Sequence, residues 1–256
     1  MPTFNYGQLV GLLRITAWNI LQGGGDRVSR ILDALEVLNT DMAILGEWRS
    51  TSPNDVLGRI KARGFVHTIE RPDPAGGYAA VLVASRRPFV LEPCAYVDDD
   101  DGHRFSALSI EGVSVGAAYV PGSEPGKDRK KRFWEFLLSE WAPTVSGRPA
   151  LLIGDLNTGK HYRDELGATF TCSEYLDHFE ALGWRDAWIE RNARTRPPAT
   201  WTSSNGGNPF RLDHALVSAS MPKPKAIEYP EIVGSVPIFG SPRISDHLPV
   251  TITLRT

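Results

Sequence analysis

Short apolar runs alternate with amphipathic stretches along most of the chain, and each kind of run predicts an element. Residues Leu12 to Ile20 form the first apolar run and predict a strand. After a Gly-Gly-Gly turn, apolar residues recur at the helical spacing i, i+3, i+4, i+7, namely Val28, Ile31, Leu32, Leu35 and Leu38. This stripe predicts a helix, with Asp26 as its N-cap.

The same reading continues to the end of the chain. Met42 to Leu45 predicts a buried strand that ends at Gly46-Glu47, and the next helix is indicated by Ser52 as N-cap, Pro53 at its first position and Gly64 past its end. A stripe of Trp134, Leu137, Leu138 and Trp141 predicts a helix over Lys127 to Trp141. The remaining predicted strands are Tyr78 to Ser85, Val113 to Val120, Ala150 to Ile153, Arg211 to Val217 and Val250 to Leu254.

The strand patterns favour one way of packing. In residues 211–216 the side chains alternate, so Leu212, His214 and Leu216 share one face while Asp213 and Ala215 share the other. A parallel sheet covered on both faces would carry continuous apolar runs instead. We therefore expect an α+β fold, a four-layer α/β/β/α sandwich of two mixed sheets with helices outside. Residues 1–256 contain no linker or repeat, which predicts a single domain.

Composition narrows the class of protein. The chain has 256 residues with 28 Lys and Arg against 30 Asp and Glu, a formal net charge of -2, which argues against a polycation that coats nucleic acid. Two cysteines, Cys94 and Cys172, have no metal-ligand spacing and are expected to be ordinary thiols in a reducing compartment. No apolar run is long enough to span a bilayer and the N-terminus has no signal-peptide pattern, so we expect a cytoplasmic protein.

Polar residues stand directly after apolar runs at several strand ends, where a rigid scaffold can present them to a pocket. Each has an ordinary explanation by itself: Asn19 as a strand-end hydrogen bonder, Glu47 as a solvated carboxylate, Asp155 as the start of an Asx turn. The segments are Trp18-Asn19-Ile20, Gly46-Glu47-Trp48, Tyr119-Val120-Pro121, Gly154-Asp155-Leu156-Asn157, Arg211-Leu212-Asp213-His214 and Ser245-Asp246-His247-Leu248-Pro249.

This set, in this order, resembles the endonuclease/exonuclease/phosphatase superfamily, which has the DNase I-like fold, and within it the abasic-site endonucleases of the exonuclease III type. The resemblance implies a Mg²⁺-dependent phosphodiester hydrolase, with Mn²⁺ able to replace Mg²⁺. It implies Glu47 as the main metal ligand, with Asn19 and Asp246 beside it, and hard oxygen ligands suit Mg²⁺.

The resemblance also implies the reacting groups. Asp155 would orient and deprotonate the attacking water, and Asn157 would hold the phosphate or water. His247 would bind a phosphate oxygen while Asp213 hydrogen-bonds its other ring nitrogen. Tyr119 would donate to the scissile phosphate or assist there as phenolate. Four further histidines, His67, His103, His178 and His214, are expected to be structural or to lie on the surface.

The expected partner is nucleic acid, most directly DNA, bound by a monomer that needs no membrane and no obligate protein partner. Tyr119 followed by Val120 and Pro121 favours the repair-nuclease branch, because other branches of the family commonly carry His at this place. Trp201 and Phe210 would line a pocket for a base-less sugar, or else pack only within a loop. Arg129 and Lys130, in the basic run at 127–132, would contact phosphate, or else form a solvated helix start.

Three positions depart from the family pattern: Leu21, Gly46 and Gly122 stand where relatives often have an acidic residue, Gln, and Asn or Gln. Loss of single hydrogen bonds should weaken phosphate positioning without abolishing a metal site. A phosphatase or phosphodiesterase acting on a small molecule, a lipid headgroup or RNA is therefore a second hypothesis. A non-catalytic protein that binds nucleic acid or a partner is a third.

Overall fold

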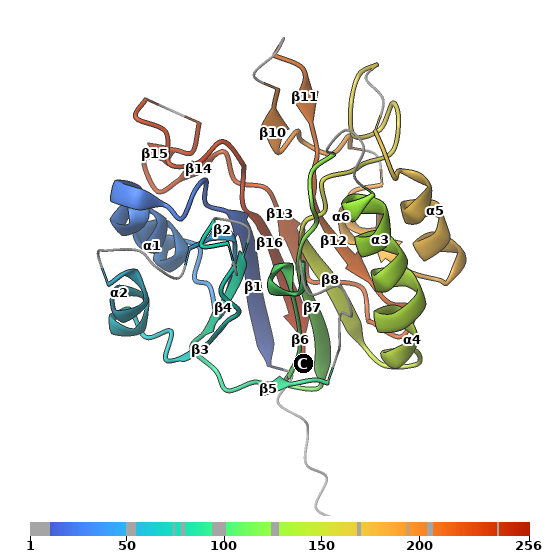
Figure 1. Cartoon of the computed structure of the whole chain (residues 1–256), viewed down its shortest axis with the longest axis horizontal. Coiled ribbons are helices and arrows are strands. Elements are labelled where there is room, and N and C mark those ends of the chain that lie inside the picture. The colour runs from blue at the N-terminus through green and yellow to red at the C-terminus, as the bar shows by residue number, and fades with distance from the viewer. Residues whose placement is uncertain are drawn as a thin grey trace, which may run out of the picture.

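Two six-stranded sheets pack face to face and helices cover the outer face of each, as Figure 1 shows. This four-layer arrangement, seen in a computed structural model, confirms the predicted α+β sandwich. The structure describes residues 11–49, 55–73, 75–77, 80–93, 101–123, 128–167, 170–193, 195–203, 207–239 and 241–256. The predictions made for Ser52, Pro53, Tyr78, Cys94 and Lys127 fall outside these ranges.

The first sheet has the strand order β13-β16-β1-β2-β4-β3. Its strands are β1 (Leu12–Asn19), β2 (Met42–Trp48), β3 (His67–Glu70), β4 (Ala80–Ser85), β13 (Ala226–Glu228) and β16 (Val250–Arg255). Only the central pair β1 and β2 is parallel, with Asn19 opposite Gly46 at its end. The carboxyl ends of the two strands therefore meet at one edge.

The second sheet repeats this plan with the strand order β5-β6-β7-β8-β12-β9. Its strands are β5 (Val90–Leu91), β6 (Phe105–Ile110), β7 (Val113–Tyr119), β8 (Ala150–Asp155), β9 (Arg185–Asp186) and β12 (Asp213–Val217). Here β7 and β8 form the parallel pair, with Tyr119 opposite Asp155 at its end, and Asp213 begins β12 opposite Asp155. Polar ends of both sheets thus point the same way.

Six helices and two small ribbons complete the described part of the chain. The helices are α1 (Val28–Val37), α2 (Val56–Ala62), α3 (Arg129–Phe136), α4 (Ala142–Thr144), α5 (Glu174–Ala181) and α6 (Ala187–Arg191), and the ribbons pair β10 (Trp201–Thr202) with β11 (Pro209–Phe210) and β14 (Ile232–Val233) with β15 (Val236–Pro237). Helices α1 and α2 lie on the side of the first sheet, and α3 to α5 on the side of the second (Figure 1). Within the described ranges, none of these helices has the length and hydropathy to cross a membrane.

Two helix details differ from the sequence prediction. Asp26 is not the N-cap of α1, because it lies inside a 3₁₀ turn, Gly25–Arg27, that precedes the helix, and no side chain caps either element. The predicted helix ending at Trp141 is interrupted, since Leu137–Trp141 forms a π-helical turn between α3 and α4. For α2 the N-cap is Asp55, whose carboxylate accepts from the Gly58 amide.

The core follows the strand alternation. In β8, Leu151 and Ile153 are buried with the residues between the sheets, whereas Ala150 and Leu152 pack under the helices on the outer face. The same division separates Ala215 from Leu216 in β12, as the alternation in the sequence predicts. Both faces of each central strand are therefore buried, which fixes their register and the direction of the polar groups at their ends.

Candidate active site

The ends of the two parallel strand pairs bring polar side chains from both sheets to one edge of the sandwich. Asn19 ends β1, Tyr119 ends β7 and Asp155 ends β8, while Glu47 lies one residue before the end of β2. Asn19 joins the sheets, because its Nδ2 donates to Glu47 Oε1 at 3.0 Å and to Asp155 Oδ2 at 3.1 Å. Residues distant in the sequence thus form one connected polar cluster.

Glu47 is aimed into this cluster by an irregularity in its strand. The pairing of β2 with β4 shifts between Leu45 and Trp48, and Glu47 has a left-handed backbone with φ 55°. A bulge re-directs a side chain, and a left-handed backbone outside glycine costs free energy that the surroundings must supply. Here Glu47 Oε2 accepts from the Gln22 amide at 2.6 Å and Oε1 accepts from Asn19, which fixes the carboxylate.

Asp213, His247 and Asp155 form the most deeply buried part of the site. His247 Nδ1 lies 2.9 Å from Asp213 Oδ2, and His247 Nε2 lies 3.9 Å from Asp155 Oδ2. The three residues expose between 1% and 5% of their surface. The Tyr229 hydroxyl donates to the Asp213 carbonyl at 3.1 Å, and the Ser245 hydroxyl accepts from the His247 amide at 3.2 Å. The imidazole is consequently held between two carboxylates.

Burial and neighbouring charges raise the pKa values of both His247 and Asp155. Burial alone would lower the pKa of His247, but the carboxylates of Asp213 and Asp155 outweigh it and raise the pKa to about 10. Burial raises the pKa of Asp155 to about 7, an effect increased by Asp213 and opposed by His247. At neutral pH, His247 is therefore an imidazolium, and Asp155 lies near the midpoint of its titration.

Tyr119 lies between Glu47 and a guanidinium. Its hydroxyl is 3.4 Å from Glu47 Oε1, and the Arg104 guanidinium lies over its ring at 4.8 Å from the centroid. Burial, with Glu47 and Asp155, raises the pKa of the phenol well above its usual value, although Arg104 acts in the opposite direction. The hydroxyl thus keeps its proton and can donate a hydrogen bond.

A cation site could be built from oxygen atoms beside this cluster. Asp246 Oδ1 is buried and lacks a hydrogen-bond partner among the described residues, while its Oδ2 accepts from Trp201 Nε1 at 3.3 Å. Carboxylate oxygens of Glu47 and Asp246 with the amide oxygen of Asn19 are the hard ligands that Mg²⁺ prefers. The donor chemistry and the partnerless Asp246 oxygen therefore fit a divalent cation.

A second group of possible ligands is less suited to a metal ion. Asp155, Asp213 and His247 have ligand atoms within 4.8 Å of one another. Metal binding needs a neutral imidazole, whereas His247 has a raised pKa and uses Nδ1 for Asp213. His247 and Asp213 therefore form a hydrogen-bonded pair, with Asp155 as a second carboxylate close to the ring.

Asn157 lies at the rim of the site in a left-handed backbone with φ 49°. Its Nδ2 donates to the Val120 carbonyl at 2.7 Å, and its amide donates to Asp155 Oδ1 at 3.0 Å. The Asn157 carbonyl in turn accepts from Lys130 Nζ at 2.5 Å. These bonds connect Asn157 to the end of β7, to β8 and to α3. They do not use its side-chain oxygen.

The two predicted phosphate-binding cations have internal partners instead. Lys130 exposes only 6% of its surface and bonds Asn157 and Thr171. Arg129 Nε donates to the fully buried Asp101 at 2.9 Å. Arg129 and Lys130 therefore hold neighbouring segments in this structure, and their contact with phosphate stays a prediction.

Trp201 and Phe210 lie beside the site, as their rings pair across the β10–β11 ribbon. The ring centroids are 5.9 Å apart, and the Trp201 ring lies 6.2 Å from that of His247. Phe210 also contacts Phe170, with centroids 5.5 Å apart. Both aromatic residues are half-buried, so each keeps part of its ring accessible next to the polar cluster.

Sequence reasoning missed two cations near the cluster. Arg104 stacks on Tyr119, and Arg27 donates to the Ile244 carbonyl at 2.7 Å while its charge acts on Asp246 and Glu47. Both follow glycine-containing segments without a recognisable motif, so only the folded arrangement identifies them.

The departures at Gly46 and Gly122 leave space for a side chain. A methyl group at Gly46 would lie 3.8 Å from the Tyr119 ring, and one at Gly122 would meet nothing within 4 Å.

Comparison with known proteins agrees with this geometry. The model of the endonuclease/exonuclease/phosphatase family matches residues 16–247. Similar solved structures include an AP endonuclease from Archaeoglobus fulgidus, with a TM-score of 0.75 and 19% identity over 94% of this chain and 99% of that one. A 3′ phosphatase from Neisseria bound to a product DNA hairpin and a 3′-5′ exonuclease from Neisseria meningitidis have TM-scores of 0.76 and 0.77, each with 20% identity over 94% of this chain and 98% of theirs. No curated protein sequence matches significantly.

Proposed function

The chain belongs to the endonuclease/exonuclease/phosphatase family, whose members hydrolyse phosphate esters, and from this premise we propose a metal-dependent phosphodiester hydrolase that acts on DNA. The observation that carries the proposal is the buried group in which His247 bridges Asp213 at 2.9 Å and Asp155 at 3.9 Å. It combines a cation for a phosphate oxygen with a carboxylate whose pKa, about 7, suits proton transfer.

Asp155 is proposed as the group that orients and deprotonates the attacking water. Its two oxygens already accept from the Asn157 amide and from Asn19 Nδ2, which fixes the direction of the carboxylate. A proton acceptor works best when its pKa lies near the working pH, and burial raises the pKa of Asp155 to about 7. Water held against Asp155 can therefore lose its proton as it attacks phosphorus.

His247 is proposed to stabilise the phosphoryl oxygens. Asp213 orients the ring and keeps it protonated, so Nε2 presents a charged hydrogen-bond donor. Tyr119 adds a neutral donor, since burial with Glu47 and Asp155 raises its pKa and favours the protonated phenol. Asn157, fixed at the rim, would hold the phosphate or the water through its amide. Donors aimed at developing negative charge lower the barrier to hydrolysis.

Glu47, Asn19 and Asp246 are proposed to hold the metal ion, Mg²⁺ or Mn²⁺ in its place. A bound ion of this type would neutralise charge on the phosphate and on the leaving oxygen. The chain prepares the site by fixing Glu47 with two hydrogen bonds and by leaving Asp246 Oδ1 without a partner among the described residues. The charges of both carboxylates also act on the nearby Arg27 guanidinium.

DNA of the type cut by abasic-site endonucleases or exonucleases is the first candidate substrate, because the solved structures of similar fold include an AP endonuclease and a 3′ phosphatase bound to a product DNA hairpin. A small phosphate ester or RNA is the second candidate, and the internal pairing of Arg129 and Lys130 favours the small ester, since a long polyanion needs free cations. A non-catalytic binding protein is the least supported, because every side chain that the chemistry needs is present.

A cleavage panel separates these candidates. Abasic duplex DNA, 3′-phosphorylated duplex DNA, single-stranded DNA, RNA and a generic phosphodiester would each be incubated with Mg²⁺, with and without chelator. We expect hydrolysis of at least one DNA substrate that chelator abolishes. Hydrolysis of only the generic ester or RNA would favour the second candidate, and no hydrolysis with any metal would revive the non-catalytic one.

A further inference from the structure

A cavity of about 210 Å³ lies beside Phe210. It is lined by Glu165, Leu166, Gly167, Asn208, Pro209 and Phe210. Leu166 exposes 70% of its surface, and Gly167 and Asn208 are also exposed, so the cavity opens to solvent. Pockets for drug-sized ligands start at roughly 300 Å³, so this one suits a smaller group such as a single ring system.

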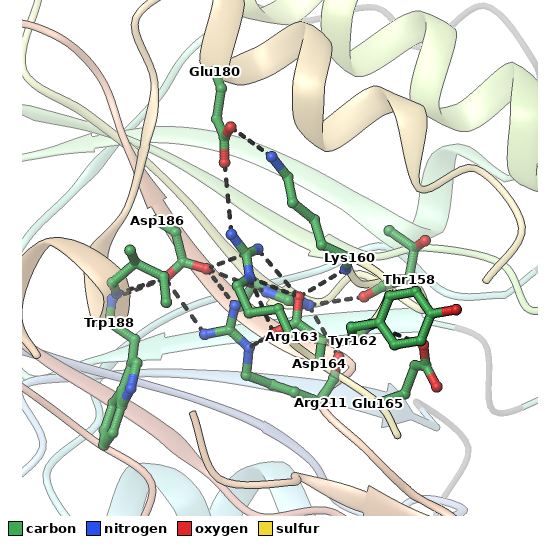
Figure 2. Close-up of polar contacts among 12 residues, drawn as sticks. Thr158, Lys160, Tyr162, Arg163, Asp164, Glu165, Glu180, Asp186, Trp188 and Arg211 are labelled. Carbon is green, nitrogen blue, oxygen red and sulfur yellow. Dashed lines mark hydrogen bonds and ion pairs between the residues drawn. The ribbon is translucent and has the colours of Figure 1, made fainter. Parts of the chain in front are cut away.

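The walls of the cavity are held by a buried ion-pair network. Arg211 is fully buried between Asp164, which lies 2.9 Å from its Nε, and Asp186, and its amide donates to the Asp164 carbonyl at 2.8 Å. Figure 2 shows Arg163 beside the same two carboxylates, and Lys160 reaching Glu180 of α5. Segment 160–167 is thereby fastened to β12 and α5, which makes the cavity preformed rather than created by a ligand.

The rings next to the cavity connect it with the candidate active site. The ring centroids of His247 and Trp201 are 6.2 Å apart, and those of Trp201 and Phe210 are 5.9 Å apart. Phe210 therefore lines the cavity and also contacts Trp201, whose ring lies next to the imidazole of His247 that is proposed to bind phosphate. A strand whose phosphate lies at His247 can bring a neighbouring nucleotide to this wall.

Charge indicates which part of that nucleotide would enter. None of the described residues that line the cavity is a cation, and the charged one among them, Glu165, accepts hydrogen bonds from the Tyr162 and Gly167 amides. A phosphate would therefore gain no ion pair from the lining. A neutral aromatic base needs none, and it could stack on Phe210, contact Leu166 and hydrogen-bond the exposed amide of Asn208.

Resting on the proposed hydrolase function, we infer that the cavity between residues 165–167 and the β10–β11 ribbon binds one unpaired nucleobase of the substrate strand near the hydrolysed phosphate. The base stacks on Phe210, and Leu166 and Asn208 close over it. The cavity then favours strands that carry a base at this position, in addition to any selection made by the site around His247.

The test measures binding without hydrolysis. Short single-stranded DNA oligonucleotides, identical except that one nucleotide at a time lacks its base, would be titrated against the whole protein in chelator, with Kd read from fluorescence anisotropy. Base stacking on an aromatic ring is worth about fivefold or more in affinity. We expect one position at which removal of the base weakens binding by at least about fivefold.

Variants then locate the effect. The double variant Leu166→Ala, Phe210→Ala should lose the base dependence, because it removes the stacking ring and the side chain that closes over the base. Any loss of affinity unrelated to the base would appear equally with the base-less oligonucleotide. Leu182→Ala is the matched control, because Leu182 is also exposed, at 56%, but lines a separate cavity with Ser218 and Ala219 beyond the other end of β12. It should keep the base dependence.

Three outcomes would overturn the inference: no measurable binding of any oligonucleotide, equal Kd for all base-less oligonucleotides, or a base dependence that survives in the double variant. Because the assay needs no turnover, it is read independently of the cleavage panel. An inactive protein with a base-dependent Kd would contradict the hydrolase proposal alone, and an active protein without it would contradict this inference alone.

Discussion

Single residues at the candidate site show what the sequence can and cannot predict. Glu47 and Asn157 were identifiable because each is a polar residue just after an apolar run. Their left-handed backbones, with φ 55° and 49°, were not, since nothing in a Glu or Asn side chain requires that conformation. Lys130 likewise resembles a surface charge in the sequence but is buried in the structure. Its hydrogen-bond partners, Asn157 and Thr171, come from segments that only folding brings close to α3.

The first prediction concerns the pKa of His247. In Asp213→Asn the largest attraction that raises this pKa is removed, while burial continues to lower it, so the pKa should fall well below about 10. The imidazolium is then lost at lower pH, and the alkaline limb of the activity profile should move toward neutral pH. NMR titration of the His247 ring and a pH-rate profile would measure both.

Asp128→Asn is the matched control for that experiment, because Asp128 is exposed at the start of α3 and makes no side-chain cap there. It should leave the His247 titration unchanged. If Asp213→Asn also left the midpoint unchanged, Asp213 would not be the partner that keeps the imidazole protonated.

At the scale of elements, the apolar periodicity located the strands and helices better than their ends. Residues 28–38 were correctly predicted as helix, but Asp26 fell into a preceding 3₁₀ turn that the sequence does not signal. Trp134 and Trp141 are both buried as the stripe requires, and the π-helical turn between them keeps this register while interrupting the α-helix. The spacing of apolar side chains therefore predicts which face of a helix is buried. It predicts the pattern of backbone hydrogen bonds less well.

The second prediction tests the join between the parallel strands of the second sheet. Gly154 has φ 146°, and a methyl group there would lie 1.9 Å from the Ala118 carbonyl oxygen of β7. Gly154→Ala should therefore force β8 away from β7, displace Asp155 and lower both the Tm and the activity. Gly102→Ala, where a methyl group would meet nothing within 4 Å, should change neither. A Gly154→Ala protein with unchanged Tm would contradict the close approach of the strands.

The third prediction concerns the buried ion pairs that hold segment 160–167. Arg211→Met leaves Asp164 and Asp186 as buried carboxylates without their main partner, which should cost roughly 3 to 5 kcal/mol in the free energy of unfolding. Arg63→Met breaks pairs with Asp33 and Glu36 at the surface and should cost under about 1 kcal/mol. Urea denaturation measures both values, and equal small losses would show that Arg211 does not hold this segment.

For the whole molecule, the alternation of apolar and polar residues predicted the sandwich because both sheets use the same plan. Each sheet has one central parallel pair, and the polar ends of both pairs meet at one edge. The order of strands and the pairing across sheets depend on long-range contacts that no local pattern contains. The net charge of -2 was correct as a sum but did not reveal that Arg129 and Lys130 of α3 are paired within the chain.

The fourth prediction follows from that distribution of charge. Because Arg129 and Lys130, the two cations expected to contact phosphate, are paired within the chain, single-stranded DNA should bind with a shallow salt dependence. Two or three phosphate contacts give a slope of log K against log salt of about -2. Binding measured in chelator across a salt series tests this. A slope of about -5 or steeper would show a basic surface that these contacts do not predict.

The most direct test of the central claim is the turnover of Asp155→Asn on the best substrate of the cleavage panel, with Mg²⁺ and saturating substrate. The change keeps the size of the side chain and removes the proton acceptor, so kcat should fall by at least about a hundredfold, while circular dichroism and Tm show a folded protein. Asp26→Asn, at an exposed carboxylate, should retain wild-type kcat. A folded Asp155→Asn protein that turns over at nearly the wild-type rate would contradict the claim that Asp155 and His247 carry the reaction.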